Sequence, residues 1–429
     1  MMQSTSAAQG IYNALFPYYA ELCVVTQSHK KGAQPGGWGG HAALFLNGAE
    51  PDPAAGHPRL RLAAAETDLS RPDSGTGISV NKIFTNTNWV AIPGRDEFYR
   101  GGLAPDQSLD QAFYDAAVQR ATAARWFAGI RIGDDLLREK PSDMSVEDFI
   151  VRHSIGTDFA LNFARTAYTV RLPLRRSSIR AVIDYLNGAN ERAQRIGYRW
   201  NAYTNNCSHV LHNALAAAGV WDPKDIRGSG AIDLAADVFS VAKGVVVGRM
   251  SDFSFPANNF VRLYEAGNER PIDDALAAFR NRDVVRTLNE GWISTGPGAL
   301  IGLHPMQEAA RNELFAAGRD PFLFSIPMFW DKRNEFERLT RKASTNLTDL
   351  GANLMRFRER YAKALTRRQS IDEGLRSVPG DDHRRAFRSF YDRFYAQLAE
   401  ELRRTDDRLS AYQRVSRVGA VTQPSRSLR

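Results

Sequence analysis

The chain has 429 residues, a hydrophobic fraction of 43% and a net charge of +8. This length suits one large domain or two smaller ones. Two cysteines exclude a disulfide framework, and the lack of any apolar run of about 18 residues excludes a hydrophobic membrane span.

Residues 1–10 are polar and small and lack the basic and apolar regions of a secretory signal peptide. We therefore expect a cytoplasmic protein, although secretion without a leader would leave the same pattern. The excess of basic residues would permit binding to nucleic acid, phospholipid or an acidic protein. The arginines, however, are interleaved with acidic residues along the expected helices, which is typical of a solvated surface.

The first part of the chain is expected to mix α and β structure. Runs rich in β-branched and aromatic residues, bounded by glycine and proline, predict strands. A glycine-rich connection over residues 32–40 separates the first two strands. The expected strands are residues 19–27, 41–47 and 59–66, with a longer strand or a hairpin over residues 78–92.

Apolar residues at three- and four-residue steps predict helices in the next part of the chain. Ser108 and Ser145 are candidate N-cap residues for the first two of these helices. A strand is expected between the second and third helices, where the pattern alternates. The expected elements are helices over residues 108–127, 145–163, 177–196 and 231–242, a helix that starts near Cys207, and a strand over residues 168–174.

The residue pattern of the sequence changes near residue 250, from mixed α and β patterns to loops and long helical patterns. Residues 293–305 are loop-like, and two long helical patterns follow over residues 329–366 and 381–417, separated by a turn that contains Pro379-Gly380. Two long helices joined in this way predict an α-hairpin. We therefore expect three parts, namely an α/β domain over residues 1–250, a helical extension over 251–417 that ends in the hairpin, and a disordered tail over 418–429.

The most informative motif is Tyr203-Thr204-Asn205-Asn206-Cys207-Ser208-His209, which precedes a helical pattern. Asn206 is a favourable N-cap residue, so Cys207 stands at the expected start of a helix. Backbone N–H groups at a helix start carry partial positive charge and favour a thiolate. The other cysteine, Cys23, lies inside an expected strand, where a buried and inert thiol is the usual state.

A thiol hydrolase also needs a base within hydrogen-bond reach of the sulfur. His41 is the strongest candidate because it opens an expected strand directly after Gly39-Gly40, where the backbone allows a ligand to approach closely. The strand that follows is apolar on both faces and should be central and rigid. The simpler interpretation is a histidine whose ring is satisfied by backbone contacts at a strand end.

Gly40-His41 at an early strand, followed much later by Tyr203-x-x-Asn206-Cys207-x-His209 at a helix start, resembles the circularly permuted papain-like cysteine hydrolases. This group includes the PPPDE peptidases, the lecithin:retinol acyltransferase-like enzymes and the Lnb-type periplasmic domain. The resemblance covers residues 18–220 in outline and rests on these two short motifs. It implies an α+β fold, with an NlpC-like antiparallel sheet and packed helices, here followed by a helical C-terminal extension.

The resemblance also implies roles for individual residues. Cys207 would be the nucleophile and His41 its general base and acid, while a backbone N–H near Cys207 would help to form the oxyanion site. These families use a third polar residue to orient the histidine. Three residues compete for that role in this sequence, namely His57 in a loop and Glu66 and Asn88 in expected strands.

Other polar and aromatic residues near the two motifs are candidates for lining a pocket. They are Trp38, Tyr203, Asn205 and Asn206. For Tyr203 and Asn205 the alternative is turn chemistry before a helix. Cys207, His209 and His212 do not form a metal motif, because residues two apart on a helix diverge and no second Cys/His group with zinc-like spacing exists. We therefore expect no metal and no cofactor.

These observations favour a cysteine hydrolase that acts on an amide, isopeptide or ester bond of a peptide or another acyl-bearing substrate. No nucleic-acid-binding module is visible, and no stable membrane insertion is expected. Two alternatives stay open. One is a non-catalytic interaction protein whose Arg-rich helical hairpin binds an acidic protein. The other is a lipid or amine acyltransferase, given the apolar residues 322–330.

Overall fold

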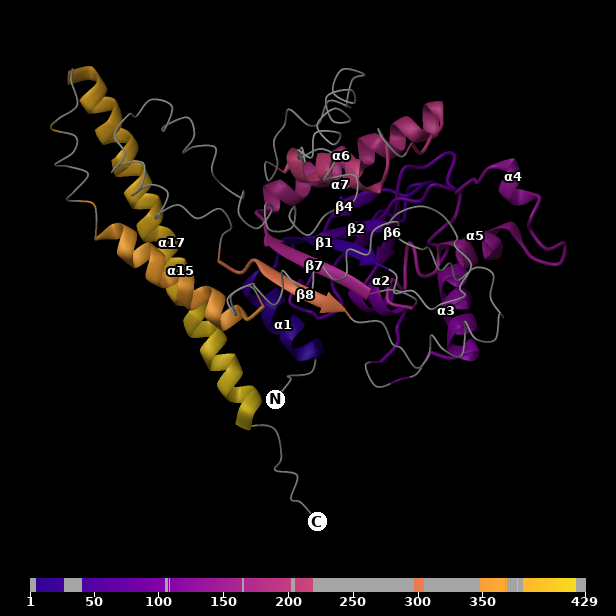
Figure 1. The fold of residues 1–429 in the computed structure, drawn as a ribbon, viewed down its shortest axis with the longest axis horizontal. Coiled ribbons are helices and arrows are strands. Elements are labelled where there is room, and N and C mark those ends of the chain that lie inside the picture. The colour runs from indigo at the N-terminus through magenta and orange to yellow at the C-terminus, as the bar shows by residue number, and fades with distance from the viewer. Residues whose placement is uncertain are drawn as a thin grey trace, which may run out of the picture. The chain divides into compact units, whose positions relative to one another are not determined.

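The computed structural model is an α+β structure with an antiparallel sheet and packed helices, which confirms the predicted fold class at this level. It divides into two compact units, Met1–Arg262 with Ile301–Lys342 and Leu263–Leu300 with Ala343–Arg429 (Figure 1). The expected boundary near residue 250 lies outside the described residues. The described residues are 5–26, 41–104, 107, 109–163, 166–201, 205–218, 297–304, 348–366, 368, 376 and 381–421.

A six-stranded sheet in the order β6-β5-β2-β1-β7-β8 forms the centre of the first unit. β1 pairs antiparallel with β2 and β7, β2 also pairs antiparallel with β5, and β5 with β6. A separate two-stranded sheet joins β3 to β4. The strand bounds are β1 Tyr19–Thr26, β2 His41–Asn47, β3 Ala49–Pro51, β4 Leu60–Leu62, β5 Thr76–Ser79, β6 Val90–Pro93, β7 Thr166–Pro173 and β8 Leu300–His304.

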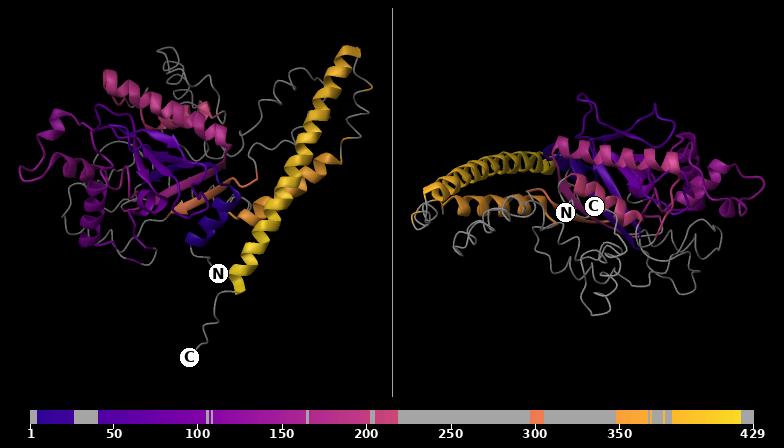
Figure 2. Two further views of the ribbon diagram at one scale, coloured as in Figure 1. Left: turned by 180° about the vertical axis from the view of Figure 1, so that it is seen from behind. Right: turned by 90° about the horizontal axis from the view of Figure 1, so that it is seen from above.

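Helices surround this sheet, and α6 and α7 lie side by side (Figures 1 and 2). α7 also packs against β2, while α2 packs against β5 and β6. A Cβ atom on Gly77 of β5 would overlap the ring of Phe98 of α2, so glycine at this position allows the close approach. The helix bounds are α1 Thr5–Leu15, α2 Arg95–Arg100, α3 Gln111–Ala123, α4 Asp134–Leu137, α5 Val146–Ser154, α6 Arg176–Ile196 and α7 Cys207–Ala217.

Strand β2 has the predicted bounds, and all seven of its residues are buried. It lies between β1 and β5, well inside the sheet. A strand that is covered on both faces needs apolar side chains on both, which explains the sequence Ala42-Ala43-Leu44-Phe45-Leu46. β2 is therefore the rigid central strand that the sequence predicts.

Several predicted elements are shorter in the structure. The expected strand over residues 59–66 is only Leu60–Leu62. In place of one long strand over residues 78–92 there are two paired strands, β5 and β6, and residues 80–89 between them belong to neither. The helix expected from Ser108 begins after Asp110, whose carboxylate accepts the Phe113 N–H at 2.8 Å. Ser108 itself lies outside the described residues.

Two further predictions need correction. The helix expected over residues 145–163 is capped by Ser145 but ends at Ser154, because Ile155 leaves the helical region and Gly156 follows with a φ of 73°. The loop expected over residues 293–305 contains β8. The helix expected over residues 231–242, and the part of the long helix before residue 348, lie outside the described residues.

The second unit contains two long helices, α15 Leu350–Leu365 and α17 Asp381–Val421, which pack against each other (Figure 2). The Arg358 guanidinium pairs with the Asp406 carboxylate at 2.6 Å across the two helices. α17 continues through Val421, so the first four residues of the expected disordered tail are helical. Residues 422–429 lie outside the described residues.

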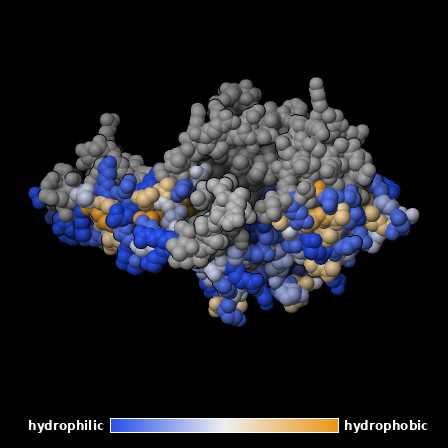
Figure 3. All heavy atoms as spheres, turned by 90° about the horizontal axis from the view of Figure 1, so that it is seen from below, coloured by the Kyte–Doolittle hydropathy of each residue, from blue (hydrophilic) through white to orange (hydrophobic). Residues whose placement is uncertain are grey.

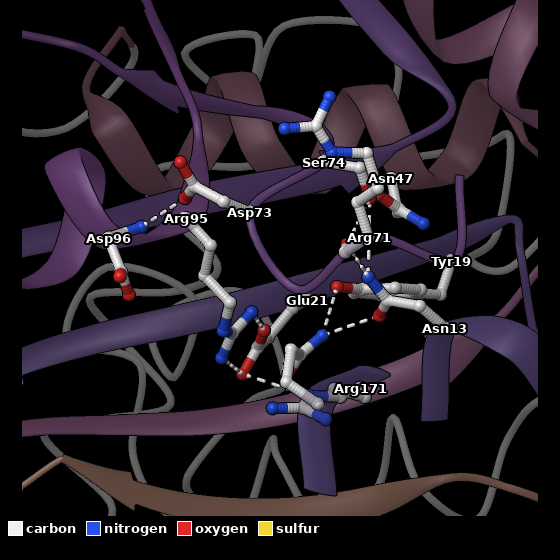
Figure 4. A network of polar contacts seen from close by, with 11 residues as sticks. Asn13, Tyr19, Glu21, Asn47, Arg71, Asp73, Ser74, Arg95, Asp96 and Arg171 are labelled. Carbon is white, nitrogen blue, oxygen red and sulfur yellow. Dashed lines mark hydrogen bonds and ion pairs between the residues drawn. The ribbon is translucent and has the colours of Figure 1, made fainter. Parts of the chain in front are cut away.

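A buried ionic network occupies one face of the main sheet (Figure 4). The Glu21 carboxylate of β1 is fully buried and binds the guanidinium of Arg95 from α2 through both oxygens. Arg171 of β7 contacts the same carboxylate at 3.3 Å. Burial by itself lowers the pKa of Arg95, but the charge and hydrogen bonds of Glu21 outweigh this effect, so the pKa is raised.

Aromatic rings enclose the two guanidinium groups. Arg95 lies over the rings of Phe45 and Tyr99, and Arg171 lies over the rings of Tyr12 and Tyr19, with distances of 4.6–5.9 Å to the ring centroids. Burial raises the pKa of all three tyrosines above the usual value, so these hydroxyls stay neutral. Two cations therefore share one carboxylate in a dry, aromatic environment.

On the face shown in Figure 3, hydrophilic side chains cover most of the described surface, and hydrophobic residues occur in small separate groups. Within the described residues, no helix has both the length and the apolar character needed to cross a bilayer.

His153 near the end of α5 gives the fold a dependence on pH. Its ring packs edge-on against Phe149 with centroids 4.4 Å apart, and burial lowers its pKa from 6.5 to about 4. The unfolded chain therefore binds a proton below pH 6.5 that the folded chain resists until about pH 4. The free energy of unfolding should have its full value above pH 6.5 and should fall as the pH decreases toward 4. The loss at pH 5 should be about 2 kcal/mol.

Urea unfolding at pH 7 and pH 5 measures this loss. His153→Gln removes the titrating ring, so the variant should lose about 2 kcal/mol less than the wild type between these two pH values. Equal losses in the two proteins would show that His153 does not cause the acid sensitivity.

Candidate functional site

Cys207 is the first residue of α7, as its sequence context predicts. Asn206 is buried, and its side-chain oxygen accepts the backbone N–H of His209 at 3.2 Å, which is the geometry of an N-cap. The same oxygen lies 2.9 Å from Nδ1 of the His209 ring. His209 therefore supports the cap of the helix.

The surroundings of the two cysteines differ. Cys207 is partly exposed, whereas Cys23 in β1 is completely buried. Tyr198, in the segment before α7, lies close enough to Cys207 for the charge of the thiolate to act on its hydroxyl. Burial raises the pKa of Tyr198, and the negative charge of a Cys207 thiolate raises it further, so Tyr198 is a neutral neighbour of the thiol. Of the two thiols, Cys207 is the one that a reactant can reach.

His41 is the first residue of β2 and is buried. Its Nε2 atom lies 2.8 Å from the hydroxyl oxygen of Ser79 on β5. In the paired strands Ser79 stands opposite Ala43, so it shares a sheet face with His41 two residues away. The sheet register, rather than a flexible loop, therefore fixes this contact.

The contact continues into a buried polar chain. The Ser79 hydroxyl donates to Oδ1 of Asp158 at 2.6 Å, and the side-chain amide of Asn81 donates to Oδ2 at 2.7 Å. The Ser79 hydroxyl also lies 3.3 Å from the carbonyl oxygen of Thr157. Ser79 and Asp158 have no exposed surface, and Asn81 has almost none. This chain therefore forms a water-excluded support behind His41.

The helix that begins with Cys207 packs against the strand that begins with His41. Both residues stand at the first position of a rigid element that long stretches of sequence separate. A helix start presents backbone N–H donors, and the strand supplies an imidazole. A thiol, an imidazole and backbone N–H donors are the groups that cysteine hydrolases use as nucleophile, base and oxyanion site.

Ser79 offers a second chemical interpretation because a serine hydroxyl near a histidine ring is also the start of a serine hydrolase site. Two observations oppose it. Ser79 is fully buried, so a substrate carbonyl cannot reach its oxygen. Its proton is directed to the Asp158 carboxylate, whereas in a serine triad the carboxylate binds the histidine.

The three residues considered as partners of His41 lie in different segments of the fold. Asn88 donates its backbone N–H to the side-chain oxygen of Asn190 on α6, and the same Asn190 donates to the Pro58 carbonyl, next to His57. The segments that carry His57 and Asn88 therefore both lie next to Asn190 of α6. Glu66 lies in an exposed turn after β4, and Asn88 precedes β6, so neither occupies the strand that the sequence predicts.

The candidate pocket residues have different outcomes. Asn205 and Asn206 directly precede α7, and the side-chain amide of Asn205 donates to the Arg199 carbonyl at 2.8 Å, which supports the turn before the helix. Trp38 and Tyr203 lie outside the described residues. In the described part of the chain, no group of three or more His, Cys, Asp or Glu side chains could hold a metal ion.

Ser79, Asn81 and Asp158 were not among the sequence candidates. Ser79 falls inside the run interpreted as strand, and Asp158 inside the helix expected over residues 145–163. The one local signal is Gly156-Thr157-Asp158, where a glycine followed by turn-forming residues indicates the end of the helix. Because the helix ends at Ser154, Asp158 lies in the loop that follows.

Comparisons of this chain with protein-family models, with curated proteins and with solved structures find no match.

Proposed function

We propose that this protein is a cysteine-dependent hydrolase that cleaves an amide, isopeptide or ester bond, with Cys207 as nucleophile and His41 as base. The observation that carries the proposal is the packing of α7, which begins with Cys207, against β2, which begins with His41. The partial exposure of Cys207 and the buried support of His41 agree with these roles.

The proposed reaction has two steps. Cys207 gives its proton to His41, and the thiolate sulfur attacks the carbonyl carbon, forming a thioester as the amine or alcohol leaves with that proton. His41 then takes a proton from water, the hydroxide attacks the thioester, and the acid leaves as the thiolate forms again. Backbone N–H groups at the start of α7 stabilise the oxyanion in both steps.

We also propose that the first unit has a circularly permuted papain-like fold. Support comes from the chain order, in which a histidine strand precedes a cysteine helix, and from the antiparallel arrangement of β1, β2, β5 and β7. The order of the two motifs is the reverse of that in papain itself. Peptide or another acyl-bearing molecule is the substrate class that this proposal favours.

The described part of the helical hairpin does not favour the alternative of a binding protein for acidic partners. The guanidinium groups of Arg358, Arg368, Arg403 and Arg404 pair with carboxylates of α17. Each of these four arginines therefore has an acidic neighbour within the second unit, although such exposed pairs are weak. The segment over residues 322–330, on which the acyltransferase alternative rests, lies outside the described residues.

Alkylation at low pH tests the assignment of the nucleophile. An ordinary thiol has a pKa of about 8.5 and holds little thiolate at pH 6. We expect iodoacetamide to modify Cys207 in the folded protein at pH 6 at least about tenfold faster than a model cysteine peptide. Cys23 is an insufficient control because burial alone protects it. A rate at Cys207 equal to that of the peptide would contradict the assignment.

A further inference from the structure

We propose that Ser79 and Asp158 are positioning residues that hold the neutral His41 ring in the tautomer with its proton on Nε2. This inference rests on the proposed function, since it assigns Nδ1 as the atom that takes the proton of the Cys207 thiol. It names partners for His41 that differ from every candidate in the sequence.

The direction of the hydrogen bonds follows from counting protons. The Ser79 hydroxyl has one proton, and two of its neighbours, the Asp158 carboxylate at 2.6 Å and the Thr157 carbonyl at 3.3 Å, can only accept. That proton therefore points to an acceptor, and the Ser79 oxygen is left to accept from His41 at 2.8 Å. Nε2 must then carry a proton, and a neutral imidazole has only one N–H.

Asp158 is itself held on both oxygens. Oδ1 accepts from Ser79, and Oδ2 accepts from the side-chain amide of Asn81 at 2.7 Å. The backbone N–H of Asp158 donates to the Ser154 carbonyl at 2.6 Å, and Gly156 donates to the Phe159 carbonyl at 2.7 Å, which closes a tight turn. Rotation of the carboxylate away from Ser79 would break both of its side-chain bonds, and the turn fixes the backbone that carries it.

Because the hydrogen bonds between His41, Ser79 and Asp158 are buried, they determine which ring nitrogen of His41 carries the proton. Ser79 and Asp158 are fully buried, so water cannot replace a lost hydrogen bond. In the other tautomer, an unprotonated Nε2 would face a hydroxyl oxygen that has no proton left for it, and two acceptors would be in contact. When His41 takes a second proton and becomes an imidazolium, the negative charge of Asp158 lies next to it, with only the Ser79 hydroxyl between them.

Nitrogen NMR of the full chain measures the tautomer without any substrate. The histidine ring nitrogens are labelled with ¹⁵N in the Cys207→Ala protein, and the signals of His41 are assigned by their loss in His41→Gln. We expect a protonated Nε2 and an unprotonated Nδ1. A proton on Nδ1 in the neutral ring would overturn the proposal.

Two substitutions in β5 provide a matched comparison. Ser79→Ala removes the bridge, so the ring should populate both tautomers, and iodoacetamide should modify Cys207 at least about tenfold more slowly. Thr76→Ala removes another buried hydroxyl of β5, which donates to the Ala49 carbonyl, and should leave both measurements unchanged. Ser79→Ala with an unchanged tautomer would overturn the role of the bridge.

The outcomes separate this inference from the proposed function. If Cys207 shows only ordinary thiol reactivity while His41 is protonated on Nε2, the hydrolase proposal fails and the positioning of the ring stands. If Cys207 is highly reactive while His41 carries its proton on Nδ1, the hydrolase proposal stands and the role of Ser79 and Asp158 fails.

Discussion

Replacing Glu21 with alanine is expected to lower the free energy of unfolding by about 3–5 kcal/mol. Glu21 has no exposed surface, and its carboxylate is shared by the guanidinium groups of Arg95 and Arg171. Without it, two cations would remain next to each other in a buried, aromatic site where water cannot solvate them. Urea unfolding followed by circular dichroism measures the loss.

Glu191→Ala is the matched control for this experiment. Glu191 also pairs with an arginine, Arg59, but both side chains are largely exposed, at 53% and 39%. An exposed ion pair contributes at most about 1 kcal/mol, so this variant should unfold close to the wild type. If the two variants unfold at the same urea concentration, the buried network does not have the importance that its geometry implies.

Replacing His41 with glutamine is expected to slow acylation of Cys207 by about 10²- to 10⁴-fold, the usual contribution of a positioned general base. The variant loses the proposed base, while α7 and its Asn206 cap remain. Stopped-flow measurement with an activated ester gives the acylation rate directly. Circular dichroism of the same sample shows whether the fold is retained.

His57→Gln serves as the control for His41→Gln. His57 lies in the loop between β3 and β4, next to the Pro58 carbonyl that binds Asn190 of α6. Losing this imidazole should leave the acylation rate within about threefold of the wild type, since neither the thiol nor its base is touched. Similar losses in the two variants would point to a general effect on the fold.

Local sequence signals are sufficient to predict the elements that present the two central residues. The glycines before His41 and the apolar run after it predict β2 with its observed bounds, and Asn206 predicts the start of α7. These signals act over a few residues, through the N-cap and the burial of a central strand, so no knowledge of distant segments is needed.

The support of His41 could not be predicted in the same way. Ser79 reaches His41 only through the register of β2 and β5, and Asp158 reaches Ser79 from 79 residues away through a turn hidden in a helix-like pattern. The Glu21 network was also not predictable from the sequence, because Arg95 and Arg171 reach Glu21 from distant elements, α2 and β7. Such contacts are set by tertiary packing, which a single sequence does not display.

The formation of a thioester on Cys207 tests the central claim most directly. The folded protein is mixed with an activated ester, quenched in acid within the first turnover, and mapped by mass spectrometry. We predict an acyl group on Cys207 that hydroxylamine removes. The Cys207→Ser variant should form no thioester at this position, and the urea-unfolded chain should be acylated far more slowly. No acyl group on Cys207, or equal acylation of the folded and unfolded chains, would contradict the account.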